Sequence, residues 1–428
     1  MLTYYSISKR HFFTTYILIL VVQYCSNLIS DELIISKSGA YCWFQDPRAV
    51  YLEGKFKRTY LGWVTSKGEL QIGYIDHNTK ETKTHTLKKF WDIDDHNVPS
   101  ILVLPNKTLM VFYTKHNKDN IYACKALSSE DITVWGEEII VAKMPKVTYS
   151  HPVYLSEEKR FYVFWRGESW KPTFSTSQDG VSWSEPKILF QDTGKESGDI
   201  RPYLKVVSNN KDEIHFAFTD GHPRNEEFNS IYYAYYRKGK FYTANGVEIG
   251  DSEALPIPHS KCDVVYDAKK GGGRAWVWDI ALDRDGKPVI AFARMPSETK
   301  HYYCYGRWTG EKWEVSTITF AGKWFPQTPE GTKEPEPHYS GGISLNHYNP
   351  DEVALSREVG NTFEIELWKT VDKGKSWQSH PITKNSKCLN VRPLIPWGYK
   401  GEKKHIIWMK GEYNHYTRFN TSIVCTLN

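Results

Sequence analysis

The sequence predicts an all-β protein, a seven-bladed β-propeller with antiparallel four-stranded blades. Three observations support this prediction: a pattern of paired apolar strands occurs seven times, its period is that of a propeller blade, and helical patterning is nearly absent. The high aromatic content, 15% of 428 residues, also favours a β-rich body. A β-sandwich or a two-domain all-β chain is the alternative.

Each repeat has a polar or charged entry, an apolar strand, a turn, a second apolar strand and a polar or basic exit. The turns contain residues that favour tight reversals, such as Asp285-Gly286. Successive entries are 50, 55, 50, 78, 59 and 54 residues apart, which are blade-sized periods. The seven segments are 46–65, 96–116, 150–167, 200–224, 278–294, 338–358 and 391–411.

Two segments in the outer parts of the repeats resemble the Asp-box. They are "SQDGVSW" (177–183) and "TVDKGKSW" (370–377). In this motif an Asp caps a hairpin turn, a Gly adopts positive φ and a Trp packs between blades. The motif is structural and supports the propeller.

The N-terminus has the layout of a secretory signal peptide. A basic lead-in precedes an apolar run of about a dozen residues, which is too short to span a bilayer comfortably. We therefore expect a cleaved signal peptide over residues 1–30 and a single catalytic propeller over residues 31–428, secreted, periplasmic or at the cell surface. Cys25 ends the run, but "VVQY" before it lacks the small residues that lipid anchoring favours.

Charge and cysteine content narrow the function classes. A net charge of +5 with mixed signs throughout is too mild to indicate nucleic-acid binding. Six cysteines follow the leader, an even number that allows disulfides in an exported chain. Cys42 and Cys425 lie near the two ends and could staple the ring. We expect a monomer with no membrane span.

Entries and exits of the seven hairpins converge on one rim, because the first strand starts where its antiparallel partner ends. Six of the seven exits are basic, and we find few carboxylates there. This pattern predicts an anionic ligand. The entries are Arg48, His96, Asn97, Tyr149, His151, Arg201, Asp279, His338 and Arg392. The basic exits are His116, Arg166, Arg224, Arg294, Arg357 and Lys410.

His96 and His116 bracket one hairpin and should lie side by side at this rim. Two close imidazoles can depress each other's pKa and leave one neutral as a base. Tyr149 and Arg166 bracket the next hairpin and should face them. This set suits β-elimination from a uronic acid, in which a cation neutralises the C6 carboxylate, a base removes H5 and an acid protonates O4. A glycosidase would need a pair of carboxylates, which we do not find.

At these residues the sequence resembles the propeller proteins with BNR-type repeats that include ulvan lyases and rhamnose-glucuronate lyases. The resemblance covers essentially the whole mature chain. It is carried by "YCWFQDPRAVY", "DDHNVPSILVLP", "YTKH", "YSHPVYL", "FWRG", "TDGHPR", "WDIALDRDGKPVIAFAR" and "EPHYSGGISL".

The resemblance implies four catalytic residues. His96 and His116 match the family's paired histidines, Tyr149 its proton-transferring tyrosine and Arg166 the arginine that neutralises the uronate. We assign His96 and Tyr149 to proton transfer and His116 and Arg166 to the carboxylate, although the histidines could exchange roles. The expected substrate-binding residues are Arg224, Asn97, Arg48, Arg201, His338 and Tyr339.

Some members of the family carry a structural metal, and this sequence contains two His-x-x-Cys units. His259 with Cys262 and His301 with Cys304 could form a tetrahedral zinc shell. The alternative is that His259 lies in a loop while the other pair belongs to a strand. No cofactor is expected in catalysis.

The sequence thus predicts a secreted polysaccharide lyase that cleaves an anionic polysaccharide at glucuronate or iduronate next to rhamnose, with ulvan as the leading candidate. One alternative is a lyase for rhamnose-α-1,4-glucuronate on gum or arabinogalactan side chains. A sialidase-like hydrolase and a non-catalytic propeller lectin are the others. Glu358 is the one suggestive carboxylate for the hydrolase.

Overall fold

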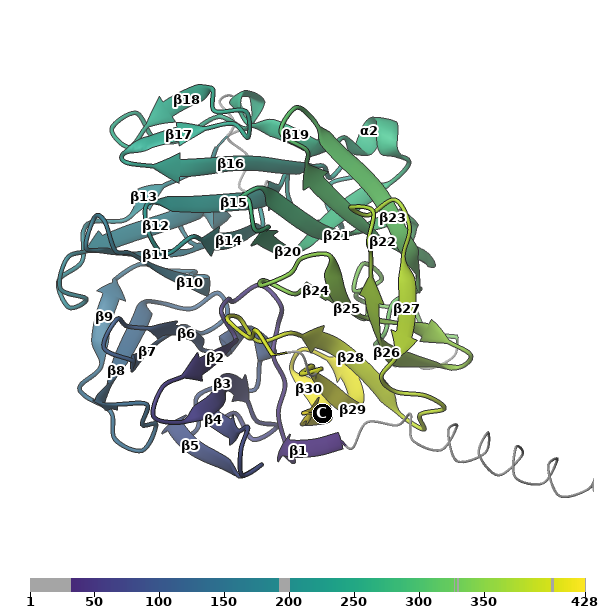
Figure 1. Ribbon diagram of the computed structural model, residues 1–428, viewed down its shortest axis with the longest axis horizontal. Helices are drawn as coiled ribbons and strands as arrows, with labels where there is room; N and C mark the ends of the chain where they lie inside the picture. The colour runs from purple at the N-terminus through teal and green to yellow at the C-terminus, as the bar shows by residue number, and fades with distance from the viewer. Residues whose placement is uncertain (1–31, 192–200, 327, 329–330, 402–403, 428) are drawn as a thin grey trace, which may run out of the picture.

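Seven antiparallel sheets form a ring in the computed structural model, which confirms the predicted seven-bladed propeller (Figure 1). The structure describes residues 32–191, 201–326, 328, 331–401 and 404–427. The predicted signal peptide, residues 1–30, lies outside the described residues.

The first three blades have four strands each, as predicted. Blade 1 contains β2 (Ala49–Glu53), β3 (Lys57–Val64), β4 (Leu70–Asp76) and β5 (Thr82–Lys88). Blade 2 contains β6 (Ser100–Val103), β7 (Thr108–Tyr113), β8 (Ile121–Ser129) and β9 (Ile139–Ala142). Blade 3 contains β10 (Thr148–Leu155), β11 (Arg160–Arg166), β12 (Pro172–Ser177) and β13 (Lys187–Ile188).

Blade 4 corrects the prediction of four strands throughout, because it is a six-stranded sheet. The long 78-residue period contains two additional elements, a fifth strand at the outer edge and β19, which pairs with β16. Its strands are β14 (Leu204–Ser208), β15 (Glu213–Thr219), β16 (Ile231–Arg237), β17 (Lys240–Tyr242), β18 (Glu248–Asp251) and β19 (Asp263–Tyr266).

Blades 5 and 6 return to four strands. Blade 5 contains β20 (Arg274–Leu282), β21 (Pro288–Ser297), β22 (Lys300–Trp308) and β23 (Trp313–Gly322). Blade 6 contains β24 (Ile343–Leu345), β25 (Glu352–Val359), β26 (Thr362–Lys369) and β27 (Gln378–Pro381).

Blade 7 closes the ring with strands from both ends of the chain (Figure 1). The first strand pairs with the last, and Leu33 lies opposite Cys425. The blade contains β28 (Leu389–Leu394), β29 (Ile407–His415), β30 (Arg418–Thr426) and β1 (Glu32–Ser36). The suggested Cys42–Cys425 staple is wrong, since both thiols are free and strand pairing joins the ends instead.

Helices are short in the described part of the chain. They are η1 (Asp95–Asn97), η2 (Glu168–Trp170), η3 (His259–Lys261) and α2 (Ala268–Gly271). Among the described residues, no helix is long and apolar enough to cross a membrane.

Both Asp-boxes have the expected geometry. Asp372 accepts a hydrogen bond from the Ser376 amide at 2.8 Å, and Trp377 packs 5.1 Å from Tyr305 of the preceding blade. Gly374 has a φ of +93°, which an L side chain rarely adopts. Trp183 of the other box likewise contacts blade 2. The turns therefore link neighbouring blades.

The segment 39–47, between β1 and β2, is buried throughout and links several blades. The Tyr41 hydroxyl donates to the carbonyl of Arg392 in blade 7, and the Trp43 indole donates to the carbonyl of Val277 in blade 5. Trp43 also stacks on an indole of blade 5 with ring centroids 4.1 Å apart. This segment therefore fills space among the inner strands and forms the floor of the site described below.

Candidate active site

A cavity of about 140 Å³ opens at the rim where the inner strands begin. Its floor comes from the segment 39–47, and its walls come from loops of several blades. The lining residues are Trp43, Phe44, His96, His116, Asn117, Tyr149, Arg166, Arg201, Tyr203, His222, Arg224, Trp276, Glu336, Tyr339 and Tyr416.

His96 and His116 stack in this cavity, with ring centroids 4.1 Å apart and 14° between the planes. Asp94 lies behind both rings. Its Oδ1 is 2.6 Å from His96 Nδ1 and its Oδ2 is 2.9 Å from His116 Nδ1. Asp94 also caps η1, and Asn97 of that turn accepts a 2.6 Å hydrogen bond from the His116 amide. One turn thus fixes both imidazoles.

The hydrogen bonds to Asp94 fix the tautomers of both histidines. Burial alone would raise the pKa of Asp94, but the charges and hydrogen bonds of His96 and His116 hold it well below its usual range. An ionised carboxylate only accepts, so each Nδ1 carries a proton and each neutral ring keeps its lone pair on Nε2. Burial, followed by the charge of His96, lowers the pKa of His116 to about 4.

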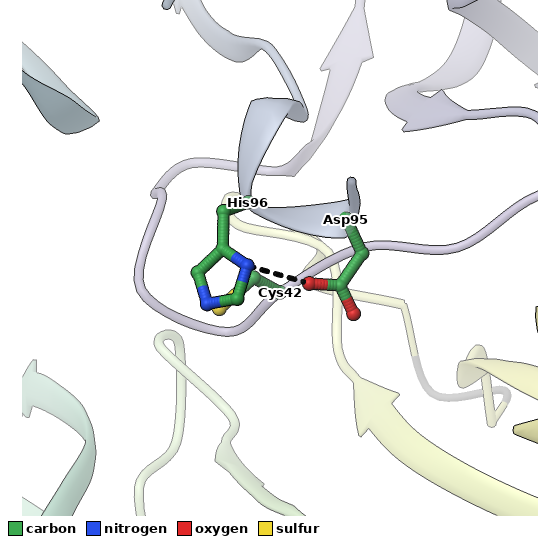
Figure 2. A group of neighbouring side chains, drawn as sticks. All are labelled: Cys42, Asp95 and His96. Atoms are coloured by element: carbon green, nitrogen blue, oxygen red, sulfur yellow. Dashed lines mark ion pairs between the residues drawn. The ribbon is translucent and has the colours of Figure 1, made fainter. Parts of the chain in front are cut away.

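His96 has a second acidic neighbour, since its Nδ1 is 3.2 Å from Asp95 Oδ1 (Figure 2). Cys42 lies beside the imidazole, and one ligand atom from each of these three residues falls within 4.8 Å of the others. One observation argues against a metal here: burial raises the pKa of the Cys42 thiol to about 12, which disfavours the thiolate that binds a metal. Arg392 and the Tyr413 hydroxyl bind the other oxygen of Asp95, Oδ2.

Tyr149 reaches the cavity from an irregular position in β10. The register with β11 shifts between Thr148 and His151, and Tyr149 has a φ of +65°. A non-glycine residue in this region costs about 1–3 kcal/mol, which the surrounding packing must offset. The bulge points the ring at His96, with centroids 5.7 Å apart. Burial raises the pKa of Tyr149 well above its ordinary value, so the phenol stays protonated.

Arg166 ends β11 as a buried cation beside Tyr149. Its guanidinium donates to the Tyr203 hydroxyl at 2.9 Å, to Asn117 Oδ1 at 2.9 Å and to Thr148 Oγ1 at 3.0 Å. All three partners are neutral. In the described part of the chain, no carboxylate lies within 4.0 Å of this guanidinium. Because a buried charge needs compensation, the arginine is poised for an anionic ligand.

His222, Arg224 and Glu336 form the opposite wall. His222 Nδ1 accepts the Arg224 amide hydrogen at 3.0 Å, so its Nε2 carries the proton. Burial lowers the pKa of His222 well below its ordinary value and keeps the ring neutral. Arg224 is half exposed and pairs with Glu336 Oε1 at 3.3 Å. Burial raises the pKa of Glu336. This wall offers hydrogen-bond donors to a sugar.

The cavity receives most of the predicted site residues. His96, His116, Tyr149, Arg166, Arg224, Arg201 and Tyr339 line it. Asn97 holds the backbone of His116 from behind. His338 lies 3.5 Å from Arg274 outside the lining.

The structure places Arg48 elsewhere. It pairs with Asp46 at 2.9 Å in a buried cluster that also contains Lys205.

The expectation of a carboxylate-poor rim is wrong. Asp94, Asp95 and Glu336 all lie at the site, in loops outside the hairpins from which the rim was inferred. Arg392 and Arg357, expected to face the ligand, instead pair with protein carboxylates.

Three of the lining residues that sequence reasoning missed lie in connections at the same rim. Asn117 follows β7, His222 follows β15 and Tyr416 lies in the turn between β29 and β30. Tyr416 packs 4.8 Å from His96. Loops between the second and third strands of a blade meet the same rim as the hairpin ends, so extending the rim argument to them would have identified these residues.

The residues predicted to hold zinc do not gather. In the described residues, no group of three close ligand atoms includes His259, Cys262, His301 or Cys304. The last two lie three positions apart on β22, so their side chains leave opposite faces of the strand. His301 Nδ1 is 2.9 Å from Ser340 Oγ, while Cys304 packs in the core. These residues do not fit a tetrahedral zinc site.

Solved structures with a similar fold include polysaccharide lyases. An ulvan lyase of family PL25 bound to -[GlcA(1-4)Rha3S]- superposes with a TM-score of 0.70 at 14% identity, covering 92% of this chain and 95% of that one. A second structure of a PL25 ulvan lyase has a TM-score of 0.67 at 14% identity, covering 92% of this chain and 94% of that one. The polysaccharide lyase Uly1 has a TM-score of 0.55 at 11% identity, covering 94% of this chain and 100% of that one. At these identities the likeness shows a shared fold.

No curated protein matches the chain. The family model "BNR repeat-containing family member" matches residues 58–321. This match spans more than half of the chain and runs from the second strand of blade 1 to the last strand of blade 5. The protein therefore belongs to the BNR repeat-containing family.

Proposed function

We propose that this protein is a polysaccharide lyase that cleaves beside a uronic acid by β-elimination. One observation carries the proposal: a buried arginine with only neutral partners faces a pair of stacked histidines and a protonated tyrosine in one cavity. A cation, a base and an acid are the three groups that this reaction requires.

Arg166 binds the C6 carboxylate of the uronate in this proposal. The guanidinium fork matches a carboxylate, and neutralising that charge makes H5 more acidic. Asn117 accepts from Arg166 through Oδ1, which leaves its amide nitrogen as a second donor beside the carboxylate.

His96 is the base. Its Nε2 lone pair faces the cavity, and two carboxylates at its Nδ1 stabilise the imidazolium that forms when it takes H5. His116 has one such carboxylate, and its pKa is lowered by burial and by the charge of His96, so we assign the base to His96.

Tyr149 is the acid. Its phenol is protonated, and its ring lies next to that of His96. As H5 moves to His96 Nε2, the C4–O4 bond breaks, its electron pair leaves with O4, and O4 takes the phenolic proton. A C4–C5 double bond remains in the uronate. Proton return from His96 to the phenolate restores the site.

His116 then has a role other than the one expected from sequence. With its Nδ1 proton held by Asp94, the neutral ring presents a lone pair, which would repel a carboxylate. We assign it to a substrate hydroxyl, from which Nε2 accepts a hydrogen bond.

The substrate class is an anionic polysaccharide with glucuronate or iduronate next to rhamnose. The bound GlcA(1-4)Rha3S fragment of the similar ulvan lyase supports this choice, and ulvan is our leading candidate. An exported location, as the N-terminal segment predicts, fits a polymeric substrate.

The test is an absorbance assay on ulvan and on gum-type glucuronides. The unsaturated uronate absorbs in the near ultraviolet, so wild-type protein should produce rising absorbance. His96→Gln and Tyr149→Phe should each lower kcat by roughly 10²–10⁴-fold, with KM little changed. Tyr348→Phe, an exposed tyrosine in the turn between β24 and β25, is the matched control and should leave kcat unchanged.

Two outcomes would overturn the proposal. New reducing ends without absorbance would indicate a hydrolase. Sugar binding without turnover, reduced in parallel by the Arg166→Gln and Tyr149→Phe variants, would indicate a lectin.

A further inference from the structure

A second and larger hollow, of about 1250 Å³, lies between blades 6 and 7. Its walls come from residues 323–326, 328, 331 and 332, which follow β23, from the turn between β25 and β26 and from the connection between β27 and β28. Each of these lies at the rim where inner strands begin, because strands alternate in direction within a blade. This hollow, the blade 6–7 groove, therefore opens on the same face as the active-site cavity.

The blade 6–7 groove and the active-site cavity share an aromatic wall. Phe325 lines the groove and packs against Tyr339, which lines the cavity, with ring centroids 6.2 Å apart. Phe325 also contacts Tyr413 at 5.1 Å. A chain lying across this face can reach both hollows by passing over that wall.

Three exposed lysines, Lys323, Lys384 and Lys387, line the groove. In the described part of the chain, none has a carboxylate within 4.0 Å of its ammonium group. Lys323 instead lies 5.7 Å from the ring centre of the half-buried Trp324, which also lines the groove. The cationic groups are thus uncompensated by the protein.

The carboxylates in the same wall are occupied. Glu364 is buried and accepts hydrogen bonds from Ser386 at 2.7 and 2.8 Å and from Thr383. Glu366 accepts two from Arg357. Glu358, on the edge of the groove, accepts the Lys323 amide hydrogen at 3.4 Å. The free charge of the groove is therefore mainly positive.

We propose that the blade 6–7 groove is a second binding site for the polymer, which holds an anionic stretch distant from the bond being cleaved. The lysines contact carboxylate or sulfate groups, and Trp324 offers a ring on which a sugar can stack. The proposal rests on the lyase function. It predicts that long substrates bind better than short ones.

The test compares polymer with a short oligosaccharide. A Lys384→Gln/Lys387→Gln variant should raise KM for ulvan about 3- to 10-fold and leave KM for a tetrasaccharide and both kcat values unchanged. Desulfated ulvan distinguishes carboxylate from sulfate as the bound anion. An equal rise in KM on both polymers assigns the lysines to carboxylates, and a rise on sulfated ulvan alone assigns them to sulfates.

The matched control is Lys373→Gln/Lys375→Gln, which removes two exposed lysines from the turn between β26 and β27, at the opposite rim of the same blade. Unchanged KM for polymer in the groove variant, or an equal rise in the control, overturns the proposal. Calorimetric titration of each variant with ulvan measures binding in the groove even if no substrate is cleaved. A failure of the groove proposal can therefore be distinguished from a failure of the lyase proposal.

Discussion

The imidazoles of His96 and His116 stack 4.1 Å apart and share one carboxylate, Asp94. Two imidazolium rings at this distance would repel strongly, so a proton on one ring disfavours a proton on the other. Burial and the charge of His96 lower the pKa of His116 to about 4, so His116 stays neutral near pH 7. The proposed mechanism accordingly gives the two histidines different roles, His96 as the base and His116 as a neutral hydrogen-bond acceptor.

Replacing Asp94 with Asn should lower kcat by roughly 10²–10⁴-fold, with KM little changed. The amide of Asn has only one accepting oxygen, so one histidine loses the acceptor for its Nδ1 proton. That histidine can then adopt the tautomer with the proton on Nε2, which faces the substrate. Asp94 does not line the cavity, and direct binding should survive. Steady-state kinetics on a uronate polymer measures the effect.

Asp285→Asn is the control for that variant, because Asp285 is exposed in a turn at the opposite rim. A rise in KM of the same size as the fall in kcat would show that Asp94 acts on binding rather than on proton transfer.

Two buried arginines should respond differently to substitution. Arg392 is fully buried against Asp95, and Arg392→Met should lower the free energy of unfolding by about 3–5 kcal/mol because it removes the buried arginine that pairs with that carboxylate. Arg166 has neutral partners, so Arg166→Met should cost less than about 2 kcal/mol while abolishing turnover. Urea unfolding at neutral pH compares them. Equal losses would mean that Arg166 has a structural role like that of Arg392.

The seven blades could be predicted because each depends on local signals. Alternating apolar strands and turn residues such as Gly286 repeat at regular intervals, and Asp-box turns mark two outer hairpins. The contact between His96 and His116 follows from the same logic, since an antiparallel hairpin returns to its starting rim.

The rest of the site depends on contacts between non-repeating loops. Asp94 directly precedes the histidine turn in sequence, yet its bridging role depends on how η1 faces the loop of His116. Tyr416 arrives from the other end of the chain. Arg48 and Arg392 look like their rim neighbours in sequence, and only their buried carboxylate partners distinguish them.

Gly342 should tolerate no side chain. Its φ is +117°, and an added Cβ would lie 2.9 Å from the Arg392 Cα. Gly342→Ala should therefore destabilise the fold by about 2–5 kcal/mol through strain and overpacking. Gly286→Ala is the control. The φ of Gly286 is +76°, but no atom lies within 4 Å of an added Cβ, so a destabilisation of about 1 kcal/mol is expected. Thermal unfolding measures both, and similar losses would contradict the packing argument.

Stability should fall as pH drops from about 6.5 to 5, because buried histidines are held neutral. His405 contacts the Thr426 carbonyl and the Thr59 hydroxyl, and burial lowers its pKa to about 3. His77 contacts the same Thr59 hydroxyl, and burial lowers its pKa to about 4. Unfolded histidines titrate near pH ~6.5, so the unfolded chain binds more protons below that pH, and the stabilisation present above it is progressively lost. Carboxylates titrate mainly below pH ~4.5 and contribute little in this window.

Calorimetric Tm values measured from pH 8 to 5 should be constant above pH 7 and decline below pH 6.5. The Tm of the His405→Gln variant should decline less steeply than that of the wild type. An identical slope in that variant would show that His405 does not contribute.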